Sequence, residues 1–230
     1  MNPAAPALLL LADGRFPSGG HAQSWGVEAA CALGDVTDVA SLERFVHGRL
    51  ATQGAVDAAV AAWLCGRLSQ GVDVDWVEVD REVTARLASP RLRAASRAQG
   101  RQMMRAGQRV WPAPSLEWCR NSHAEGPHQC VALGAVAAAA QLAPEQAALC
   151  ALHHLVGAAT TAAVRLLGLD PFEVTALAAR AAPHVGDAAR RAAREWTTWT
   201  TPADLPATVG LMADVYAEHH ATWEVRLFAS

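Results

Sequence analysis

Histidine and cysteine side chains gather in the stretch "HAEGPHQC", which contains His123, His128 and Cys130 within eight residues. Imidazole and thiolate groups are ligands that zinc, nickel and copper take from proteins. The spacing matches no closed structural metal site, and the sequence offers no evident fourth ligand. The pattern therefore favours a loop before a helix, with Cys130 buried as a small apolar residue. A metal site at these three residues stays as the alternative.

Two pairs of adjacent histidines, His153–His154 and His219–His220, lie in segments with helical character. Neighbouring residues on a helix point about 100° apart, so neither pair can easily hold one metal ion. We expect one histidine of the first pair to face the core and to hydrogen-bond a backbone group. His220 and Glu224 are four residues apart, a spacing that predicts a modest ion pair on a helix surface.

The stretch "DGRFPSGGHAQSWGVEAA" places Gly19 and Gly20 just before a segment with helical character. Glycines ahead of a helix can expose backbone N–H groups to an anion such as phosphate. A Walker-type loop also needs a lysine, and all 19 basic residues of this chain are arginines. Gly19, Gly20 and Gly26 also lack the spacing of a dinucleotide-binding loop. The pattern therefore favours a tight structural turn over a nucleotide site.

Groups for nucleophilic or acid–base catalysis form no recognisable constellation in this sequence. No G-x-S-x-G elbow or comparable motif presents a nucleophile beside a base. The acidic pairs Asp73/Asp75 and Glu78/Asp80 fall in a polar stretch, which we interpret as a solvated face. The search for chemistry thus indicates a binding or scaffolding protein rather than an enzyme.

Arginines recur every four residues along the predicted helix "RLRAASRAQGRQMMRAGQR", a spacing that gives one slowly turning basic stripe. The stripe comprises Arg93, Arg97, Arg101, Arg105 and Arg109. It could contact phosphates or an acidic protein surface, but no interleaved aromatic residues support nucleic acid. On the opposite side, Gln99 and Gly100 interrupt the apolar face and predict a close helix approach or a polar contact.

Composition narrows the class of protein further. The chain of 230 residues has a formal net charge of −3, so no global basic field favours nucleic acid as a partner. Its five cysteines are far apart and odd in number, which favours a reducing cytoplasm over a disulfide framework. No basic residue precedes Arg15, and the apolar run before it is short, so we expect no signal peptide.

Helical periodicity recurs along the whole chain and predicts an all-α fold. Three helix starts carry a capping residue followed by proline, at Ser89-Pro90, Asp170-Pro171 and Thr201-Pro202. The alternating stretch "GVDVDWVEVD" could be a strand, but it continues into "REVTARLA" and favours a helix. We therefore predict one domain over residues 1–230, a bundle of roughly nine to ten helices around a central apolar helix. Residues 111–126 are predicted to be irregular.

The stretch from His128 to Leu169 predicts two consecutive helices that are apolar on nearly all sides. Such helices belong either in a protein core or in a membrane. Most of these residues are alanine, polar side chains lie mid-helix, and the first segment is short for a membrane span of about 20 residues. The pattern therefore favours core helices over a membrane hairpin.

Four stretches together resemble the UreF family of urease accessory proteins. They are "RFPSGGHAQSWGVEAA", "SRAQGRQMMR" followed by "VWP", "ALHHLVGAATTAAVRLLGLD" and the closing "HHATWEVRLFAS". They occur in the order of the family and span nearly the whole chain. The chain departs from the usual pattern at His21, Ala22 and Trp25, in "LGLDPFEV" and in "WEVRLFAS", which bears on single loop contacts rather than on the family.

The resemblance implies an all-helical protein without a catalytic site of its own. Such proteins pair with a UreD/UreH-type accessory protein, recruit the GTPase UreG and engage apo-urease for nickel insertion. It implies a homodimer within that complex, nickel handled by the assembly, and GTP bound by the partner GTPase, with no cofactor on this chain. The alternative is a helical metal-dependent enzyme or ligand-binding domain that uses His123, His128 and Cys130.

The resemblance also implies a partner-docking tail at residues 222–230, here called the C-terminal tail. Its expected contact residues are Trp223, Arg226, Leu227, Phe228 and Ser230. Gly19, Gly20 and Glu28 are expected to lie near the same partner-facing surface. Apolar residues so close to a chain end stabilise only when they are buried. The alternative is a tail that folds back on its own domain.

Overall fold

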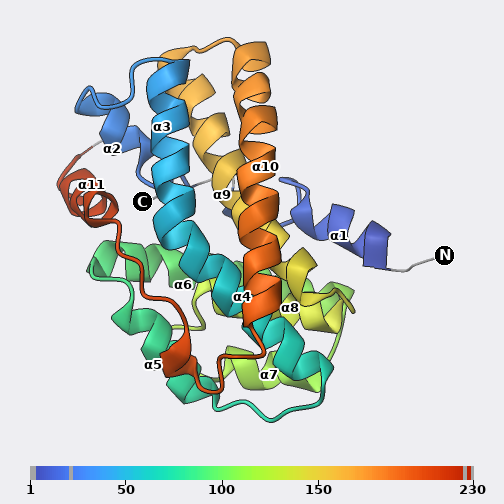
Figure 1. Ribbon diagram of the computed structural model, residues 1–230. Coiled ribbons are helices and arrows are strands. Elements are labelled where there is room, and N and C mark those ends of the chain that lie inside the picture. Colours follow the sequence, from blue (N-terminus) through green and yellow to red (C-terminus); the bar gives the residue numbers. More distant parts are fainter. Residues whose placement is uncertain (1–3, 21–22, 225–226, 229–230) are drawn as a thin grey trace.

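The computed structural model describes residues 4–20, 23–224, 227 and 228 of the chain. In these residues eleven α-helices and no strand are present, which confirms the predicted all-α fold (Figure 1). The helices are α1 (Ala4–Ala12), α2 (Val27–Ala32), α3 (Val39–Arg49), α4 (Ala55–Ser69), α5 (Trp76–Ala85), α6 (Pro90–Val110), α7 (Pro114–Arg120), α8 (Gln129–Ala139), α9 (Pro144–Leu167), α10 (Pro171–Glu195) and α11 (Leu211–Ala221).

The centre of the bundle is formed by α4, α8 and α9 rather than by one helix. Helix α4 packs along both α8 and α9, while α6 covers α8 and α10 covers α9. Every residue of α4 from Val56 to Gly66 is buried. Small residues allow this close packing, because a Cβ at Gly134 of α8 would lie only 2.9 Å from the carbonyl oxygen of Ala61.

Helix α9 is the one helix, among the described residues, that is long and apolar enough to cross a membrane. In its most apolar 18-residue window, 61% of the residues are buried inside the protein. It runs between α4 and α10 (Figure 1). These neighbours and this burial are those of a core helix, as the sequence predicts.

Two of the three predicted helix starts are confirmed. The Ser89 hydroxyl accepts hydrogen bonds from the first turn of α6, and the Asp170 carboxylate accepts one from the first turn of α10. The third start, at Thr201, gives only the short 3-10 helix Pro202–Asp204. Pro206 explains the early end, because proline disfavours helical backbone in the residue before it and lacks an N–H group.

Two further segments test the predictions of secondary structure. The alternating stretch contains α5, capped by the Asp75 carboxylate, so the choice of helix over strand is confirmed. The segment predicted to be irregular contains the short helix α7, so that prediction is wrong in part. Pro114 lies in its first turn, where proline is preorganised for a helix and no N–H partner is lost.

A π-helix at Leu50–Gly54 joins α3 to α4. Such wide turns within a helix often mark functional positions. Gly54 passes close to α9 here, since a Cβ on it would lie 3.3 Å from the side chains of Leu152 and Leu155. The π-helix therefore brings the junction of α3 and α4 close to α9, directly after the last residue of α3, Arg49.

Candidate functional site

The three residues of the metal hypothesis do not converge. His128 precedes α8 and is fully buried, with one ring nitrogen 2.9 Å from the Thr84 hydroxyl and the other 3.1 Å from the Ser96 hydroxyl. Burial, reinforced by a nearby arginine, lowers the pKa of His128 to about 4, so the ring is neutral. Both ring nitrogens are thus already engaged in hydrogen bonds that hold the start of α8.

The other two residues of that hypothesis face different surroundings. His123 is exposed, and its Nδ1 accepts a hydrogen bond from the Glu125 backbone N–H. The Cys130 thiol is buried near Asp57, and burial raises its pKa well above the ordinary value. Within the described residues no group of three or more metal-ligating side chains is assembled. The structure therefore does not support the alternative metal site at His123, His128 and Cys130.

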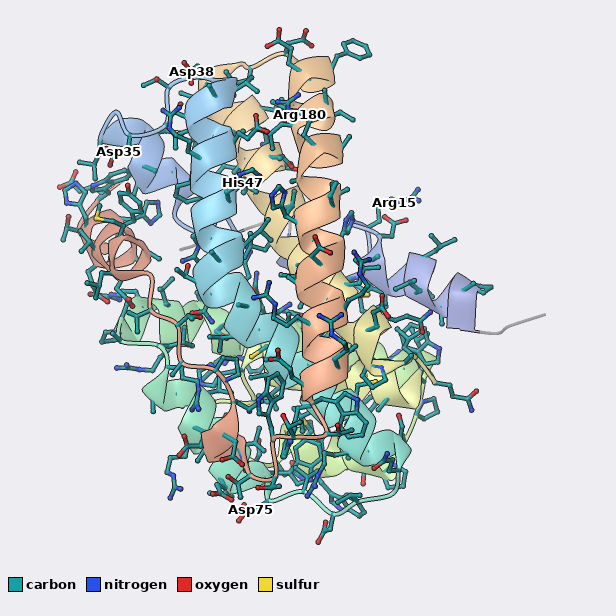
Figure 2. All side chains as sticks on the ribbon, viewed as in Figure 1. Arg15, Asp35, Asp38, His47, Asp75 and Arg180 are labelled. Atoms are coloured by element: carbon teal, nitrogen blue, oxygen red, sulfur yellow. The ribbon has the colours of Figure 1, made fainter. Side chains whose placement is uncertain are left out.

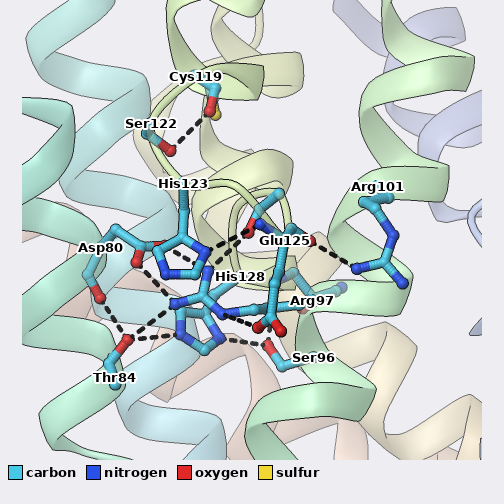
Figure 3. Close-up of polar contacts among 12 residues, drawn as sticks. Asp80, Thr84, Ser96, Arg97, Arg101, Cys119, Ser122, His123, Glu125 and His128 are labelled. Atoms are coloured by element: carbon cyan, nitrogen blue, oxygen red, sulfur yellow. Dashed lines mark hydrogen bonds and ion pairs between the residues drawn. The ribbon is translucent and has the colours of Figure 1, made fainter.

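A buried polar cluster surrounds Arg97 instead (Figure 3). The two terminal nitrogens of Arg97 donate to the two carboxylate oxygens of Asp80 at 2.9 and 2.7 Å. They also donate to the Gly126 carbonyl at 2.6 Å and to the Thr84 hydroxyl at 3.1 Å. Asp80 was predicted on a solvated face and Arg97 in an exposed basic stripe, and both predictions are wrong. The two charges neutralise each other between α5 and α6.

Of the remaining stripe arginines, Arg93 and Arg101 are hydrogen-bonded, and Arg101, Arg105 and Arg109 are exposed. Arg93 donates to backbone carbonyls at the end of the preceding loop, and Arg101 donates to the Glu125 carbonyl. Arg105 and Arg109 are exposed on α6. The basic surface that could meet an acidic partner is therefore shorter than the sequence predicts, and that contact stays a prediction.

The C-terminal tail is anchored by the buried carboxylate of Glu28 on α2. One carboxylate oxygen accepts the Leu227 backbone N–H at 2.8 Å, and the other accepts the Phe228 backbone N–H at 2.9 Å. His220 of α11 lies with its Nε2 2.8 Å from the same carboxylate. The predicted surface pair of His220 with Glu224 is therefore wrong, because His220 is buried against Glu28.

The described tail residues follow the alternative in which the tail folds back on its own domain. Phe228 is buried, and the Arg165 guanidinium carbon lies 4.9 Å from the centre of its ring. Trp223 is half-buried against the imidazole of His220. Leu227 is 66% exposed and is available to a partner. Arg226 and Ser230 lie outside the described residues.

The glycine turn and the tail meet at one surface cavity of about 400 Å³. Gly20 and Phe228 both line it, together with Gln99, Gln129 and His153. Gly19 has a positive φ of 79°, which glycine adopts without strain, and it packs against the side chain of Gln102 on α6. Residues from opposite ends of the sequence, predicted to share a partner-facing surface, are thus brought together.

The histidine pair of α9 behaves as predicted. His154 Nε2 lies 2.9 Å from the Leu11 carbonyl oxygen of α1. Burial lowers the pKa of His154 to about 4, so the neutral ring donates this bond. His153 is exposed at the edge of the surface cavity. The pair therefore holds α1 against α9 and presents one imidazole to the cavity.

A second buried cluster, at the π-helix, was missed by the sequence analysis. Arg49 is buried, and Gln53 donates to the Asp57 carboxylate at 2.8 Å. Burial raises the pKa of Asp57 to about 6. A signal was present, because Arg49 falls three residues after Val46 and seven after Leu42, on the apolar face of α3. A charged residue in an apolar stripe indicates a buried charge.

A family model and several known proteins that are similar to this chain all carry the name UreF. A family model described as UreF matches residues 36–182. Urease accessory protein UreF of Mycobacterium sp. (strain JLS) is 43% identical over 224 residues, which are 97% of each chain. The protein of that name from Mycolicibacterium vanbaalenii is 38% identical over 224 residues, again 97% of each chain. That from Mycobacterium tuberculosis (strain H37Rv) is 43% identical over 168 residues, 73% of this chain and 75% of the relative.

Proposed function

The chain belongs to the UreF family of urease accessory proteins, and from this membership we propose that it is a non-enzymatic scaffold. It bridges a UreD/UreH-type protein and the GTPase UreG for GTP-dependent nickel insertion into apo-urease. The observation that carries the proposal is the similarity to UreF proteins over 97% of the chain. The meeting of the glycine turn with the C-terminal tail supports a single docking surface for the UreD/UreH-type partner.

The docking surface is centred on the surface cavity and the exposed part of the tail. Leu227 presents an exposed apolar side chain next to Phe228, which lines the cavity, while Glu28 holds the backbone that carries it. An exposed apolar side chain on a held backbone is suited to bind a partner, because little conformational entropy remains to be lost. Arg226, Ser230 and Trp223 complete the proposed contact set.

Within this proposal the chain carries neither nickel nor nucleotide of its own. Nickel is handled by the assembly, and GTP is bound by the partner GTPase. The absence of lysine, which a Walker-type loop needs, supports the second part. We further propose a homodimer within the complex and a cytoplasmic location, and the five cysteines, all without disulfide bonds, fit a reducing compartment.

Co-purification of the tagged chain with the UreD/UreH-type protein, UreG and apo-urease tests the docking surface. Leu227→Asp places a charge on the proposed contact and should abolish the complex and urease activation. Val77→Asp is the matched control, since Val77 is equally exposed but lies on α5, which does not line the cavity. Both variants should keep the wild-type melting temperature. Normal assembly of Leu227→Asp would place the docking surface elsewhere.

Calorimetry and sedimentation test the remaining parts of the proposal. The purified chain should show no micromolar GTP binding with magnesium and no stoichiometric tightly bound metal. Either result would instead favour the metal-dependent or ligand-binding alternative. Sedimentation of the complex with the UreD/UreH-type partner should give two copies of each chain, and a one-to-one heterodimer at high concentration would exclude the homodimer.

A further inference from the structure

Arg49 is a buried cation with unsatisfied hydrogen-bond donors. The residue is only 6% exposed at the end of α3. Its Nε and Nη2 are buried and have no acceptor within hydrogen-bonding distance among the described residues. A guanidinium group stays protonated in proteins, so the charge is not removed by burial. Buried donors of this kind are nearly always satisfied in folded proteins, and these point to an acceptor that the chain itself does not supply.

The neighbouring side chains do not neutralise Arg49. The acidic groups that act on Arg49 are Asp57, which accepts a hydrogen bond from Gln53, and Asp214. No ion pair joins Arg49 to Asp57 in the described structure, although both are buried. On another side the ring of Trp25 lies 6.0 Å from the guanidinium carbon and covers the cation without accepting its N–H bonds. The positive charge of Arg49 is therefore shielded from bulk water but not paired.

Arg49 borders a small inner cavity of about 20 Å³. A cavity needs roughly 10–15 Å³ by this measure to hold one water-sized particle, so there is room for one. Its polar lining consists of Arg49, Gln53, Asp57, Gln23, Ser96 and Gln99. Gln23, Trp25 and Gln99 also line the surface cavity, so the inner cavity adjoins an open route to solvent.

We propose that the inner cavity binds one monatomic anion, for which chloride is the abundant candidate. The guanidinium group of Arg49, which lines the cavity, holds the ion, and amide N–H₂ groups of the lining glutamines can donate to it. The volume excludes phosphate and larger oxyanions. The π-helix that follows Arg49 places the donors here, so the bound anion ties the junction of α3 and α4 to α6.

Bromide, which replaces chloride and scatters anomalously, locates the ion directly. Crystals of the full chain grown in sodium bromide should show one anomalous peak within hydrogen-bonding distance of Arg49. In solution, chloride should stabilise the chain against urea relative to gluconate at equal ionic strength. A chloride concentration ten times the dissociation constant raises the ratio of folded to unfolded chain about tenfold.

Arg49→Met removes the proposed donors and should abolish both the anomalous peak and the chloride-specific stabilisation. Arg44→Met is the matched control, because Arg44 lies on the same helix and is exposed, and it should keep both. Density for water alone beside Arg49, or a direct Arg49–Asp57 pair in the crystal, would overturn the proposal. A chloride effect that survives in Arg49→Met would also overturn it.

Asp57→Asn provides an independent variant if Arg49→Met does not fold. Removing the negative charge beside the cavity should lower the chloride concentration for half-maximal stabilisation severalfold, since the carboxylate repels an anion. An unchanged or higher half-maximal concentration would contradict an anion at this position.

Discussion

Arg97 and Arg49 are both buried, at 5% and 6% exposure, yet their surroundings differ. Arg97 makes a bidentate pair with Asp80 and donates further to a carbonyl and a hydroxyl. Arg49 leaves two of its nitrogens without an acceptor. Burial alone therefore does not tell what a charged side chain does. The completeness of its hydrogen bonds separates a charge that holds the fold from one that is open to a ligand.

The two arginines also differ in what they connect. Asp80 comes from α5, Arg97 from α6, and Gly126 precedes α8, so the Arg97 cluster joins three segments around the start of α8 (Figure 3). Arg49 lies beside the same stretch of α6, because its cavity is lined by Ala95, Ser96 and Gln99, but it comes from the junction of α3 with α4. Figure 2 shows how densely side chains fill the bundle between these elements.

The largest effect should come from Arg97→Met. The change leaves the buried Asp80 carboxylate without its partner, which typically costs about 3–5 kcal/mol. Urea unfolding followed by circular dichroism measures the loss. Arg105→Met removes an exposed arginine from the same helix and should change the free energy of unfolding by less than about 0.5 kcal/mol. Equal effects of the two changes would show that the Arg97 cluster does not hold the fold.

The pH dependence of stability should have opposite signs in the two clusters. The folded pKa of His128 is lowered to about 4, so its contribution is present above pH 6.5 and is lost as pH falls towards 4. The folded pKa of Asp57 is raised to about 6, so its contribution is present below pH 4 and is lost as pH rises through 6. Each change is at most about 3.5 kcal/mol.

Two variants isolate these contributions. The stability of the wild type minus that of Asp57→Asn should decrease from pH 4 to 6. The stability of the wild type minus that of His128→Gln should decrease from pH 6.5 to 4. Urea midpoints measured at fixed chloride across this range give both differences. Differences that do not vary with pH would mean that neither group is perturbed by the fold.

Gly100→Ala should disturb the Arg97 cluster without touching its charges. A Cβ at Gly100 would overlap the Pro127 carbonyl oxygen, next to Gly126, which accepts from Arg97. Overpacking of this kind costs about 1–3 kcal/mol. Gly157→Ala is the control, because no atom lies within 4 Å of the added Cβ in α9, and it should stabilise by about 0.5–1 kcal/mol. Equal unfolding midpoints for the two variants would refute the close approach of α6 and the loop.

The sequence predicted the elements better than the contacts between them. Apolar periodicity and the caps at Ser89 and Asp170 identify helices because both signals are local. The Arg97–Asp80 pair joins residues 17 positions apart on different helices, so periodicity on either helix alone shows only a polar face. The close approach at Gly100 was predicted because an interrupted apolar face is itself a local signal.

The contacts of the C-terminal tail, which join residues far apart in the sequence, are likewise not predicted by local sequence patterns. The resemblance to the UreF family assigned Glu28 and Phe228 to a partner-facing surface, which stays a prediction, whereas the structure buries both and joins them by a hydrogen bond. The bonding between a carboxylate on α2 and backbone N–H groups about 200 residues later has no local pattern. With Phe228 buried, removing the last five residues should also lower stability by about 1.5–3 kcal/mol.

The smallest effect should come from Arg49→Met measured at low chloride. Methionine fills similar space without a charge, and replacing buried ionic groups by apolar ones is often neutral. The change loses the contact with Trp25, and such contacts contribute up to about 2 kcal/mol when buried, but it also removes the desolvation of an unpaired cation. We therefore expect the free energy of unfolding to change by less than about 1 kcal/mol in urea titrations, far less than for Arg97→Met.

The contrast between the two arginines depends on this result. A loss as large as that of Arg97→Met would mean that Arg49 is satisfied by groups of the chain itself, and both arginines would then be structural. A small loss of stability in Arg49→Met at low chloride, which increases as chloride is added, would support the distinction between the two arginines. Only the wild type would then be stabilised by the anion. Arg44→Met should follow the wild type at every chloride concentration, since its side chain is exposed on the same helix.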